Sequence, residues 1–127
     1  MTFINVVIVG SGPAGIGIAS LLSKTDLDFI VLEKNEIGSS FLKWPENMEM
    51  ITPSFPSNAF GQMDLNSICP QTSPAFAFKK EHLNGMEYAQ YLRKIDSLNN
   101  INVEPNTEVK KVTKVDEGWL VDTNQGK

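Results

Sequence analysis

The first third of the chain alternates apolar runs with a stretch of helical spacing. Residues 3–9 (FINVVIV) form an almost continuous apolar run, which predicts a strand buried on both faces, as in a parallel sheet. Residues 13–23 then predict a helix, with Ile16, Ala19, Leu21 and Leu22 on its apolar side. A second apolar run, residues 29–32 (FIVL), predicts a second buried strand. These elements predict one βαβ unit of right-handed connection.

Regular periodicity is absent between residues 36 and 80. Five prolines interrupt this segment, and stretches such as residues 51–58 (ITPSFPSN) favour neither a helix nor a strand. A segment of this length in a small domain indicates either a functional covering loop or a linker. Its six aromatic residues favour a packed covering loop, and for each ring we expect packing on the domain rather than on a ligand. They are Phe41, Trp44, Phe55, Phe60, Phe76 and Phe78.

The second half of the chain returns to regular patterns. Asn84 and Glu87 have the spacing of a capping box, which predicts a helix that runs to about Leu98 and ends at the Asn99-Asn100 pair. Its apolar positions are Tyr88, Ala89, Leu92, Ile95 and Leu98. Residues 101–104 predict a short third strand, and residues 109–115 and 119–123 predict a β-hairpin with Gly118 in its turn. His82, the single histidine, is expected to have a surface or capping role.

The junction of the first strand and first helix has the spacing G-x-G-x-x-G. Gly10 permits a sharp strand-to-helix turn, and Gly12 allows a pyrophosphate to approach the backbone. Gly15 and Ala19 let the helix press against the sheet. Because the loop contains no Lys or Arg, backbone amides at the helix N-terminus have to carry the anion. An apolar strand before the motif and a helix after it are the context of a dinucleotide-binding turn.

Glu33 follows the second predicted strand, 23 residues after Gly10. An acidic residue at about this spacing binds a ribose 2′-hydroxyl in dinucleotide-binding folds, and its charge repels a 2′-phosphate. Glu33 therefore predicts FAD or NAD at this site rather than NADP. The alternative is an ordinary solvated glutamate at a strand end.

The composition limits the number of domains, the possible partners and the cellular compartment. The chain has 127 residues, which predicts a single domain over residues 1–127, and its 41% hydrophobic and 20% charged content is typical of a globular protein. A net charge of −4 without a basic stripe argues against nucleic-acid partners and against an anionic membrane surface. Cys69 is the single cysteine, so no internal disulfide can form and a reducing cytoplasm is expected. The N-terminal run lacks a basic flank and is too short to span a bilayer, and no metal-ligand spacing surrounds His82.

Together these motifs resemble the N-terminal FAD-binding portion of two-dinucleotide-binding flavoproteins, in particular the flavin-containing monooxygenase-like oxidoreductases. Three blocks carry the resemblance: residues 7–15 (VIVGSGPAG), residues 32–34 (LEK) and residues 37–45 (IGSSFLKWP). The third block has Ser39-Ser40-Phe41 where the family has Gly-Gly-x-Trp. The resemblance implies an α/β, Rossmann-like FAD-binding domain: a parallel sheet with an added antiparallel β-hairpin or meander, incomplete at the C-terminus.

The resemblance also implies the positions of the cofactor contacts. The pyrophosphate would lie on Gly10, Ser11, Gly12, Pro13, Ala14 and Gly15. Glu33 and Lys34 would lie at the adenosine ribose, and Val109 would meet the adenine through its backbone. Ser40, Phe41, Trp44 and Thr52 would lie toward the flavin half. No cysteine pair occurs near residues 38–45, which argues against the disulfide reductases with an early redox pair; a branch with a later pair stays open.

The implied function is the FAD-binding part of an NAD(P)H-dependent, monooxygenase-like oxidoreductase acting on a small-molecule substrate or oxygen. A second glycine fingerprint, a fourth parallel strand and a catalytic acid or base with a partner are missing from the sequence, so we expect a piece of a longer flavoprotein without turnover of its own. Without a fourth parallel strand, the first strand would lie at an open edge of the sheet, which would favour self-association of the chain. The alternatives are a non-catalytic dinucleotide-binding module or inactive remnant, and a small NAD-binding Rossmann domain.

Overall fold

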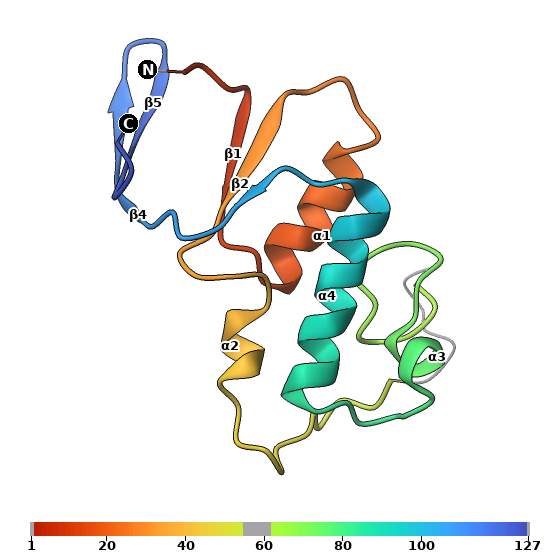
Figure 1. The fold of residues 1–127 in the computed structure, drawn as a ribbon. Helices are drawn as coiled ribbons and strands as arrows, with labels where there is room; N and C mark the ends of the chain where they lie inside the picture. The colour runs from red at the N-terminus through yellow and green to blue at the C-terminus, as the bar shows by residue number, and fades with distance from the viewer. Residues whose placement is uncertain (1, 55–61, 127) are drawn as a thin grey trace.

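The computed structural model describes residues 2–54 and 62–126 and has the expected α/β architecture (Figure 1). Its strands are β1 (Val6–Val9), β2 (Phe29–Leu32), β3 (Val103–Glu104), β4 (Val109–Val115) and β5 (Gly118–Thr123). Its helices are α1 (Pro13–Leu22), α2 (Ser39–Leu42), α3 (Pro74–Phe78) and α4 (Gly85–Asn99). The predicted elements are all present; β1 and β3 are shorter than the predicted runs 3–9 and 101–104.

The parallel sheet has the strand order β1-β2-β3. Val6 of β1 is in register with Phe29 of β2, and Val31 of β2 is in register with Val103 of β3. The central strand β2 is buried, as predicted. The prediction that the first strand is buried on both faces is wrong, since β1 is only half-buried and Val9 is 60% exposed. Within the described residues β1 pairs with β2 alone and so forms an edge of the sheet.

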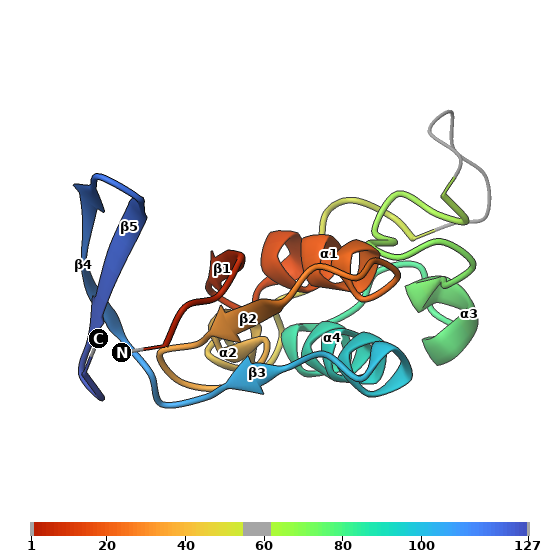
Figure 2. The same ribbon diagram turned by 90° about the horizontal axis from the view of Figure 1, so that it is seen from above.

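Helices α1 and α4 lie on one side of the parallel sheet, and the β4–β5 hairpin lies on the other (Figure 2). The hydrophobic core is formed by the helices, the sheet and the covering segment, and it includes Ile16, Ala19, Val31, Cys69, Leu83, Tyr88, Tyr91, Leu92, Ile95 and Ile101. Two predicted core positions are wrong: Leu21 is 53% exposed and Leu98 is 73% exposed. At about 100° per residue, Leu21 lies nearly opposite the buried side of α1, and Leu98 lies about a quarter turn from the middle of the buried stripe of α4.

The capping prediction for α4 is confirmed. The Asn84 side chain accepts a hydrogen bond from the Glu87 amide, and the Glu87 carboxylate accepts one from the Asn84 amide, each over 2.9 Å. Asn100 caps the other end in the left-handed region. Residues next to the helix therefore cap both ends of α4. The covering segment packs against this helix.

The segment 36–80 contains two short helices, α2 and α3, that the sequence pattern did not indicate. Residues 49–54 also run alongside residues 81–84: the Met50 amide donates to the Leu83 carbonyl, and the Ser54 amide donates to the Glu81 carbonyl. A ring nitrogen of His82 lies 2.8 Å from the Met50 carbonyl oxygen, so the histidine side chain also connects residues 49–54 with residues 81–84.

The aromatic residues of this segment differ in how they pack. Phe41 and Phe78 pack against the core, whereas Phe76 is exposed, and Phe55 and Phe60 lie outside the described residues. The Trp44 ring lies 5.0 Å from the Phe41 ring, so packing on the domain is seen for Phe41, Trp44 and Phe78 and not for Phe76.

The β4–β5 hairpin is antiparallel, and Gly118 adopts a positive φ of 148° at its turn, as a glycine there predicts. Its apolar side chains Val112, Val115 and Trp119 are exposed. The hairpin joins the parallel sheet near the end of β2, where the Thr107 amide donates to the Glu33 carbonyl over 2.8 Å.

Candidate dinucleotide-binding site

The turn between β1 and α1 depends on two of its glycines. Gly10 has a φ of +96°, which glycine adopts without strain, and its amide donates to the Leu32 carbonyl over 2.8 Å. A Cβ on Gly15 would overlap the carbonyl oxygen of Gly10. Gly10 and Gly15 are therefore required by the turn itself, before any ligand is considered.

Gly12 differs from these two glycines. Its φ of −77° suits any residue, and a Cβ added to it would meet no atom of the protein within 4 Å. Glycine at this position is therefore not explained by the packing or conformation of the chain. A bound group that approaches the backbone closely would explain it, so the residues present fit a pyrophosphate.

Gly12 is also the N-cap of α1, and no side chain caps this helix end. Pro13 occupies the first helical position, and the first turn carries no acidic residue. The amides of Ala14 and Gly15 are the free donors of that turn. An uncapped helix N-terminus with a partial positive charge is suited to hold an anion.

Beside this turn, the Glu33 carboxylate is almost completely buried, with 7% exposure. Its Oε2 accepts hydrogen bonds from the Ser11 hydroxyl over 2.6 Å and from the Ser11 amide over 2.8 Å. Its Oε1 accepts one from the Asn35 amide over 2.8 Å. The alternative of an ordinary solvated glutamate is therefore wrong.

Two opposing effects act on the ionisation of Glu33. Burial raises its pKa, but the hydrogen bonds from the Ser11 hydroxyl and from the Asn35 and Ser11 amides, with the charge of Lys43, lower it further than burial raises it. The net pKa lies below its ordinary value, so the group is a carboxylate at neutral pH. A carboxylate has about four acceptor positions, and three are used here; one on Oε1 can still accept from a ligand hydroxyl.

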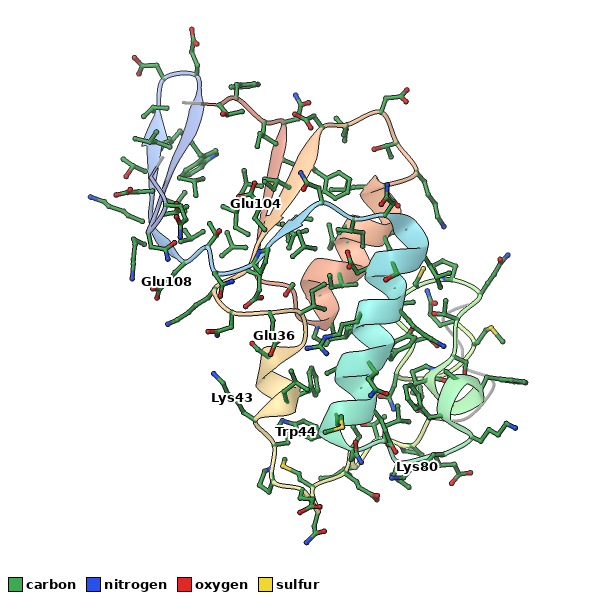
Figure 3. The ribbon with its side chains drawn as sticks, viewed as in Figure 1. Glu36, Lys43, Trp44, Lys80, Glu104 and Glu108 are labelled. Atoms are coloured by element: carbon green, nitrogen blue, oxygen red, sulfur yellow. The ribbon has the colours of Figure 1, made fainter. Side chains whose placement is uncertain are left out.

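The residues predicted at the adenosine end come together around Glu33. The Thr107 amide binds the Glu33 carbonyl and the Asn106 amide binds the Asn35 carbonyl, which brings Val109 to the same end of the sheet. The Lys34 ammonium forms an ion pair with Glu108 over 2.9 Å, and Lys110 pairs with the same carboxylate. Figure 3 shows Glu108 at the lower end of the hairpin. Lys34 is thus held toward the hairpin.

The residues predicted at the flavin half form a second group. The Phe41 ring lies 5.0 Å from the Trp44 ring and 4.8 Å from the Tyr88 ring. A Cβ on Gly85 would overlap the Phe41 carbonyl oxygen, so the N-terminus of α4 lies directly against this cluster, where Figure 3 shows Trp44. Ser40 is exposed on α2, and Thr52 is exposed in the covering segment.

Over residues 2–54 and 62–126, no hydrogen bond or ring contact joins the flavin-half residues directly to Gly10, Gly12, Gly15 or Glu33. Lys43, two residues after Phe41, is close enough to Glu33 for its charge to lower the pKa of that carboxyl slightly. The structure therefore assembles the predicted contacts as two neighbouring groups.

Three residues that the sequence interpretation did not name as site residues support these groups. The Asn35 amide completes the shell of Glu33, and Asn66 and Tyr88 bind the covering segment to α4. A signal existed for Tyr88, which lies on the apolar stripe of α4. Asn66 lies in an aperiodic stretch, and nothing in its spacing marks it.

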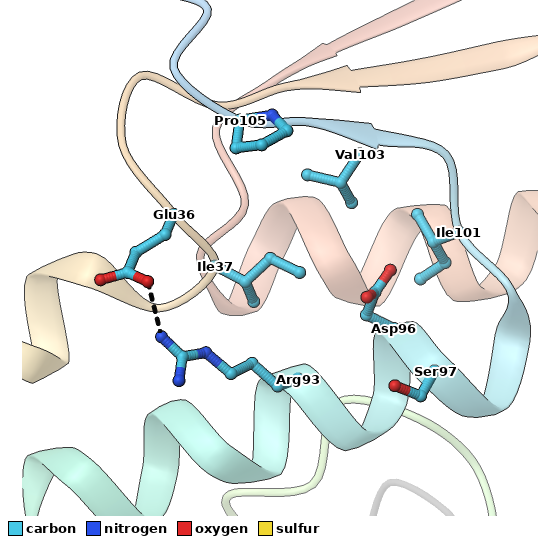
Figure 4. Close-up of a pocket in the computed structure, with 8 residues that line it drawn as sticks. All are labelled: Glu36, Ile37, Arg93, Asp96, Ser97, Ile101, Val103 and Pro105. Atoms are coloured by element: carbon cyan, nitrogen blue, oxygen red, sulfur yellow. Dashed lines mark hydrogen bonds and ion pairs between the residues drawn. The ribbon is translucent and has the colours of Figure 1, made fainter.

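A depression of about 400 Å³ lies elsewhere, between the start of the covering segment, β3 and α4 (Figure 4). Its lining consists of Glu36, Ile37, Arg93, Asp96, Ser97, Ile101, Val103 and Pro105. Arg93 donates to Glu36 over 2.9 Å at its rim, and burial raises the pKa of Asp96. None of these residues is a predicted cofactor contact, so the depression is separate from the glycine turn.

No group of three or more His, Cys, Asp or Glu side chains is arranged to hold a metal ion in the part of the chain that the structure describes. None of the helices described here has the length and apolarity needed to cross a membrane.

Several solved structures share this fold. The bacillithiol disulfide reductase of Staphylococcus aureus is 18% identical with a TM-score of 0.79, and the match covers 98% of this chain and 35% of that one. The flavin-containing monooxygenase of Stenotrophomonas maltophilia is 19% identical with a TM-score of 0.73, over 100% of this chain and 36% of that one. The thioredoxin reductase of T. acidophilum is 20% identical with a TM-score of 0.61, over 97% and 31%.

The chain thus spans about a third of the length of the proteins that it resembles in structure. At these identities the likeness concerns the fold, and it confirms the predicted Rossmann-like class. Independently, the family model for "pyridine nucleotide-disulphide oxidoreductase" matches residues 7–127, which include the glycine turn, Glu33 and the hairpin. The chain belongs to the pyridine nucleotide-disulphide oxidoreductase family.

Proposed function

We propose that this chain is the FAD-binding portion of an NAD(P)H-dependent, monooxygenase-like flavoprotein oxidoreductase. The observation that carries the proposal is the space beside Gly12, at an uncapped helix N-terminus and next to a buried carboxylate. The chain does not itself use this space, and its chemistry suits the adenosine diphosphate part of a dinucleotide.

The roles of the residues follow from their donors and acceptors. The pyrophosphate would lie against the glycine turn, with the Ala14 and Gly15 amides as donors. The residues around it would be Gly10, Ser11, Gly12, Pro13, Ala14 and Gly15. An anion at such a helix end is stabilised by about 0.3–2 kcal/mol. The free acceptor position on Glu33 would take a ribose hydroxyl, and its negative charge would repel a 2′-phosphate. These roles favour FAD or NAD over NADP at this turn.

The remaining predicted contacts complete the cofactor site in this proposal. Lys34 and the Val109 backbone would lie at the adenosine end, and Ser40, Phe41, Trp44 and Thr52 toward the flavin half. When bound, FAD supplies the redox chemistry, by taking electrons from a nicotinamide and passing them to oxygen or a small-molecule acceptor. The chain's own residues bind and orient the cofactor, and we expect no turnover from them alone.

The monooxygenase-like assignment rests on the sequence near α2. Residues 38–45 contain no cysteine, and Cys69, the single cysteine of the chain, is buried in the core. A disulfide reductase with an early redox pair would need two cysteines at this place. The buried Cys69 also fits a reducing cytoplasm.

Two observations favour other functions. The glycine turn and Glu33 would serve NAD as well as FAD, which supports a small NAD-binding domain. The exposed Val9 on the edge strand β1 supports an inactive remnant that self-associates through this edge.

Ligand binding to the purified chain distinguishes these functions. FAD, NAD and ADP are titrated separately, with flavin fluorescence for FAD and the shift of the thermal midpoint for the other two. The proposal predicts binding of FAD and ADP, and a flavin absorption band after gel filtration. Stabilisation by NAD without FAD binding would identify the NAD-binding domain. Binding of none of them, with aggregation, would identify the remnant.

A further inference from the structure

Tyr88 of α4 contacts two segments that are far apart in the sequence. Its ring lies 4.8 Å from the ring of Phe41 in α2. Its hydroxyl donates to the Asn66 carbonyl of the covering segment over 2.8 Å. Tyr88 is buried, so both contacts lie inside the protein.

Asn66 continues this connection. Its side-chain amide donates to the Thr52 carbonyl over 2.9 Å and to the Ser54 hydroxyl over 2.8 Å. Its own backbone amide donates to the Asp64 carboxylate over 2.8 Å, and only 7% of the residue is exposed. An unbroken series of contacts therefore leads from Phe41 through Tyr88 and Asn66 to Thr52.

We propose that Tyr88 and Asn66 are positioning residues that set the distance between the two segments of the flavin half, Phe41 with Trp44 on one side and Thr52 on the other. This inference rests on the proposed function, which places these two segments beside the flavin. Neither Tyr88 nor Asn66 has to touch the cofactor for this role.

Asn66 holds the middle of the stretch that contains Thr52. Met50 and Ser54 are fastened to residues 83 and 81 by backbone hydrogen bonds, and Thr52 lies between these two points. Its carbonyl takes its hydrogen bond from the Asn66 side chain. Loss of this donor would release the middle of the stretch while its ends stayed in place.

The hydroxyl of Tyr88 is a reliable donor. Burial raises its pKa, and the nearby Tyr91 and Asp64 raise it further, so the hydroxyl stays protonated over the physiological range. Removal of the hydroxyl would leave the Asn66 carbonyl without this partner in a buried place. The ring contact with Phe41 would remain, so the substitution acts on the connection alone.

Tyr91 provides a matched control on the same helix. It is also buried, and its hydroxyl also binds the covering segment, accepting from the Ile68 amide over 3.1 Å and lying 2.7 Å from the Thr72 hydroxyl. The stretch that it holds contains no predicted cofactor contact. Tyr88→Phe and Tyr91→Phe therefore remove the same group from two buried rings that lie 5.5 Å apart, and of the two hydroxyls only that of Tyr88 binds Asn66.

The test compares FAD with ADP as ligands of the full chain. ADP reaches only the glycine turn and Glu33, whereas FAD also needs the flavin half. For Tyr88→Phe we expect FAD binding to weaken about fivefold to tenfold, as the loss of one buried hydrogen bond implies, with ADP binding within about twofold of the unaltered chain. For Tyr91→Phe we expect both affinities to stay within about twofold.

Asn66→Ala is the second variant, with Thr72→Val as its control, and it is decisive if Tyr88→Phe does not fold. Because the two residues act in series, Asn66→Ala combined with Tyr88→Phe should weaken FAD binding by less than the product of the two single effects. Equal effects of Tyr88→Phe and Tyr91→Phe on FAD, or a parallel loss of ADP and FAD, would overturn the positioning role and leave the proposed function standing. If the unaltered chain binds neither ligand, the proposed function fails and this role fails with it.

Discussion

The Ser11 hydroxyl donates to the Glu33 carboxylate over 2.6 Å, and the amide of the same serine donates to the same oxygen over 2.8 Å. One residue of the glycine turn thereby holds the acidic group at the end of the neighbouring strand. These two hydrogen bonds couple the orientation of the turn to the ionisation of Glu33.

Ser11→Ala removes one of the three donors to the carboxylate. We expect the pKa of Glu33 to rise, because fewer hydrogen bonds then stabilise the carboxylate against the effect of burial. The free energy of unfolding at pH 7 should fall by about 1–2 kcal/mol. Urea denaturation measures the stability, and an NMR titration of the side-chain carboxyl carbon measures the pKa. The exposed Ser97→Ala serves as control, and an unchanged Glu33 titration in Ser11→Ala would contradict the prediction.

The stability of the chain should depend on pH through Glu33. Its pKa in the folded state lies below the ordinary value of 4.5, so its stabilising contribution is complete above that value and is lost as the pH falls through the folded pKa. Between about pH 5.5 and pH 3, unfolding free energies should therefore fall more steeply for the unaltered chain than for Glu33→Gln. Glu117→Gln, in the exposed hairpin turn, should keep the steep dependence. Parallel curves for Glu33→Gln and the unaltered chain would show that Glu33 does not contribute.

Gly12→Ala should separate binding from folding. The added Cβ meets no protein atom within 4 Å, so we expect the free energy of unfolding to change by less than about 1 kcal/mol. The same Cβ would occupy the space proposed for the pyrophosphate, so FAD binding should weaken at least tenfold, or about 1.4 kcal/mol. Flavin fluorescence titration and urea denaturation measure the two quantities. A folded Gly12→Ala chain with unchanged affinity would remove the observation on which the proposed function rests.

Gly15→Ala should have the reverse pattern, with an effect on the fold itself. Its Cβ would overlap the Gly10 carbonyl oxygen, which belongs to the backbone of the turn and cannot rotate away. We expect the free energy of unfolding to fall by about 2 kcal/mol or more, measured by urea denaturation without ligand. A stability equal to that of Gly12→Ala would show that the turn relaxes more easily than its geometry implies.

Gly85→Ala should disturb the contact between α2 and α4. Alanine favours a helix over glycine by about 1 kcal/mol, but here its Cβ would overlap the Phe41 carbonyl oxygen and lie 3.0 Å from the Trp44 Cβ. We expect a net loss of about 1–3 kcal/mol and a shift of the Trp44 fluorescence, recorded in a Trp119→Phe background. Gln90→Ala, on the exposed side of α4, should leave both unchanged. A stabilised Gly85→Ala chain would show that the two helices move apart at little cost.

Local patterns in the sequence were sufficient to predict the strands, the helices α1 and α4, the glycine turn and the capping box of α4, but not the short helices α2 and α3. The turn and the capping box depend on residues within a few positions of one another: Gly10 with Gly15, and Asn84 with Glu87. The apolar runs also predicted the central strand β2 correctly. The two exposed leucines have different causes. Leu21 lies nearly opposite the buried side of α1, so helical geometry itself places it in solvent. Leu98 lies at the margin of the α4 stripe, and helical spacing alone does not fix how wide a stripe the neighbouring elements cover.

The sequence by itself thus determined a βαβ unit with a dinucleotide-type turn and an acidic residue after the second strand. The missing fourth parallel strand also led us to expect an open first strand, and β1 is an edge among the described strands. Only the tertiary structure decided that Ser11 and Asn35 hold Glu33 in a buried place and that Asn66 joins Thr52 to Tyr88. Turns and caps are set by neighbours along the chain, whereas burial and hydrogen-bond partners depend on which distant segments come to lie side by side. No spacing rule relates residues 52, 66 and 88, because the aperiodic covering segment is ordered by its packing on α4.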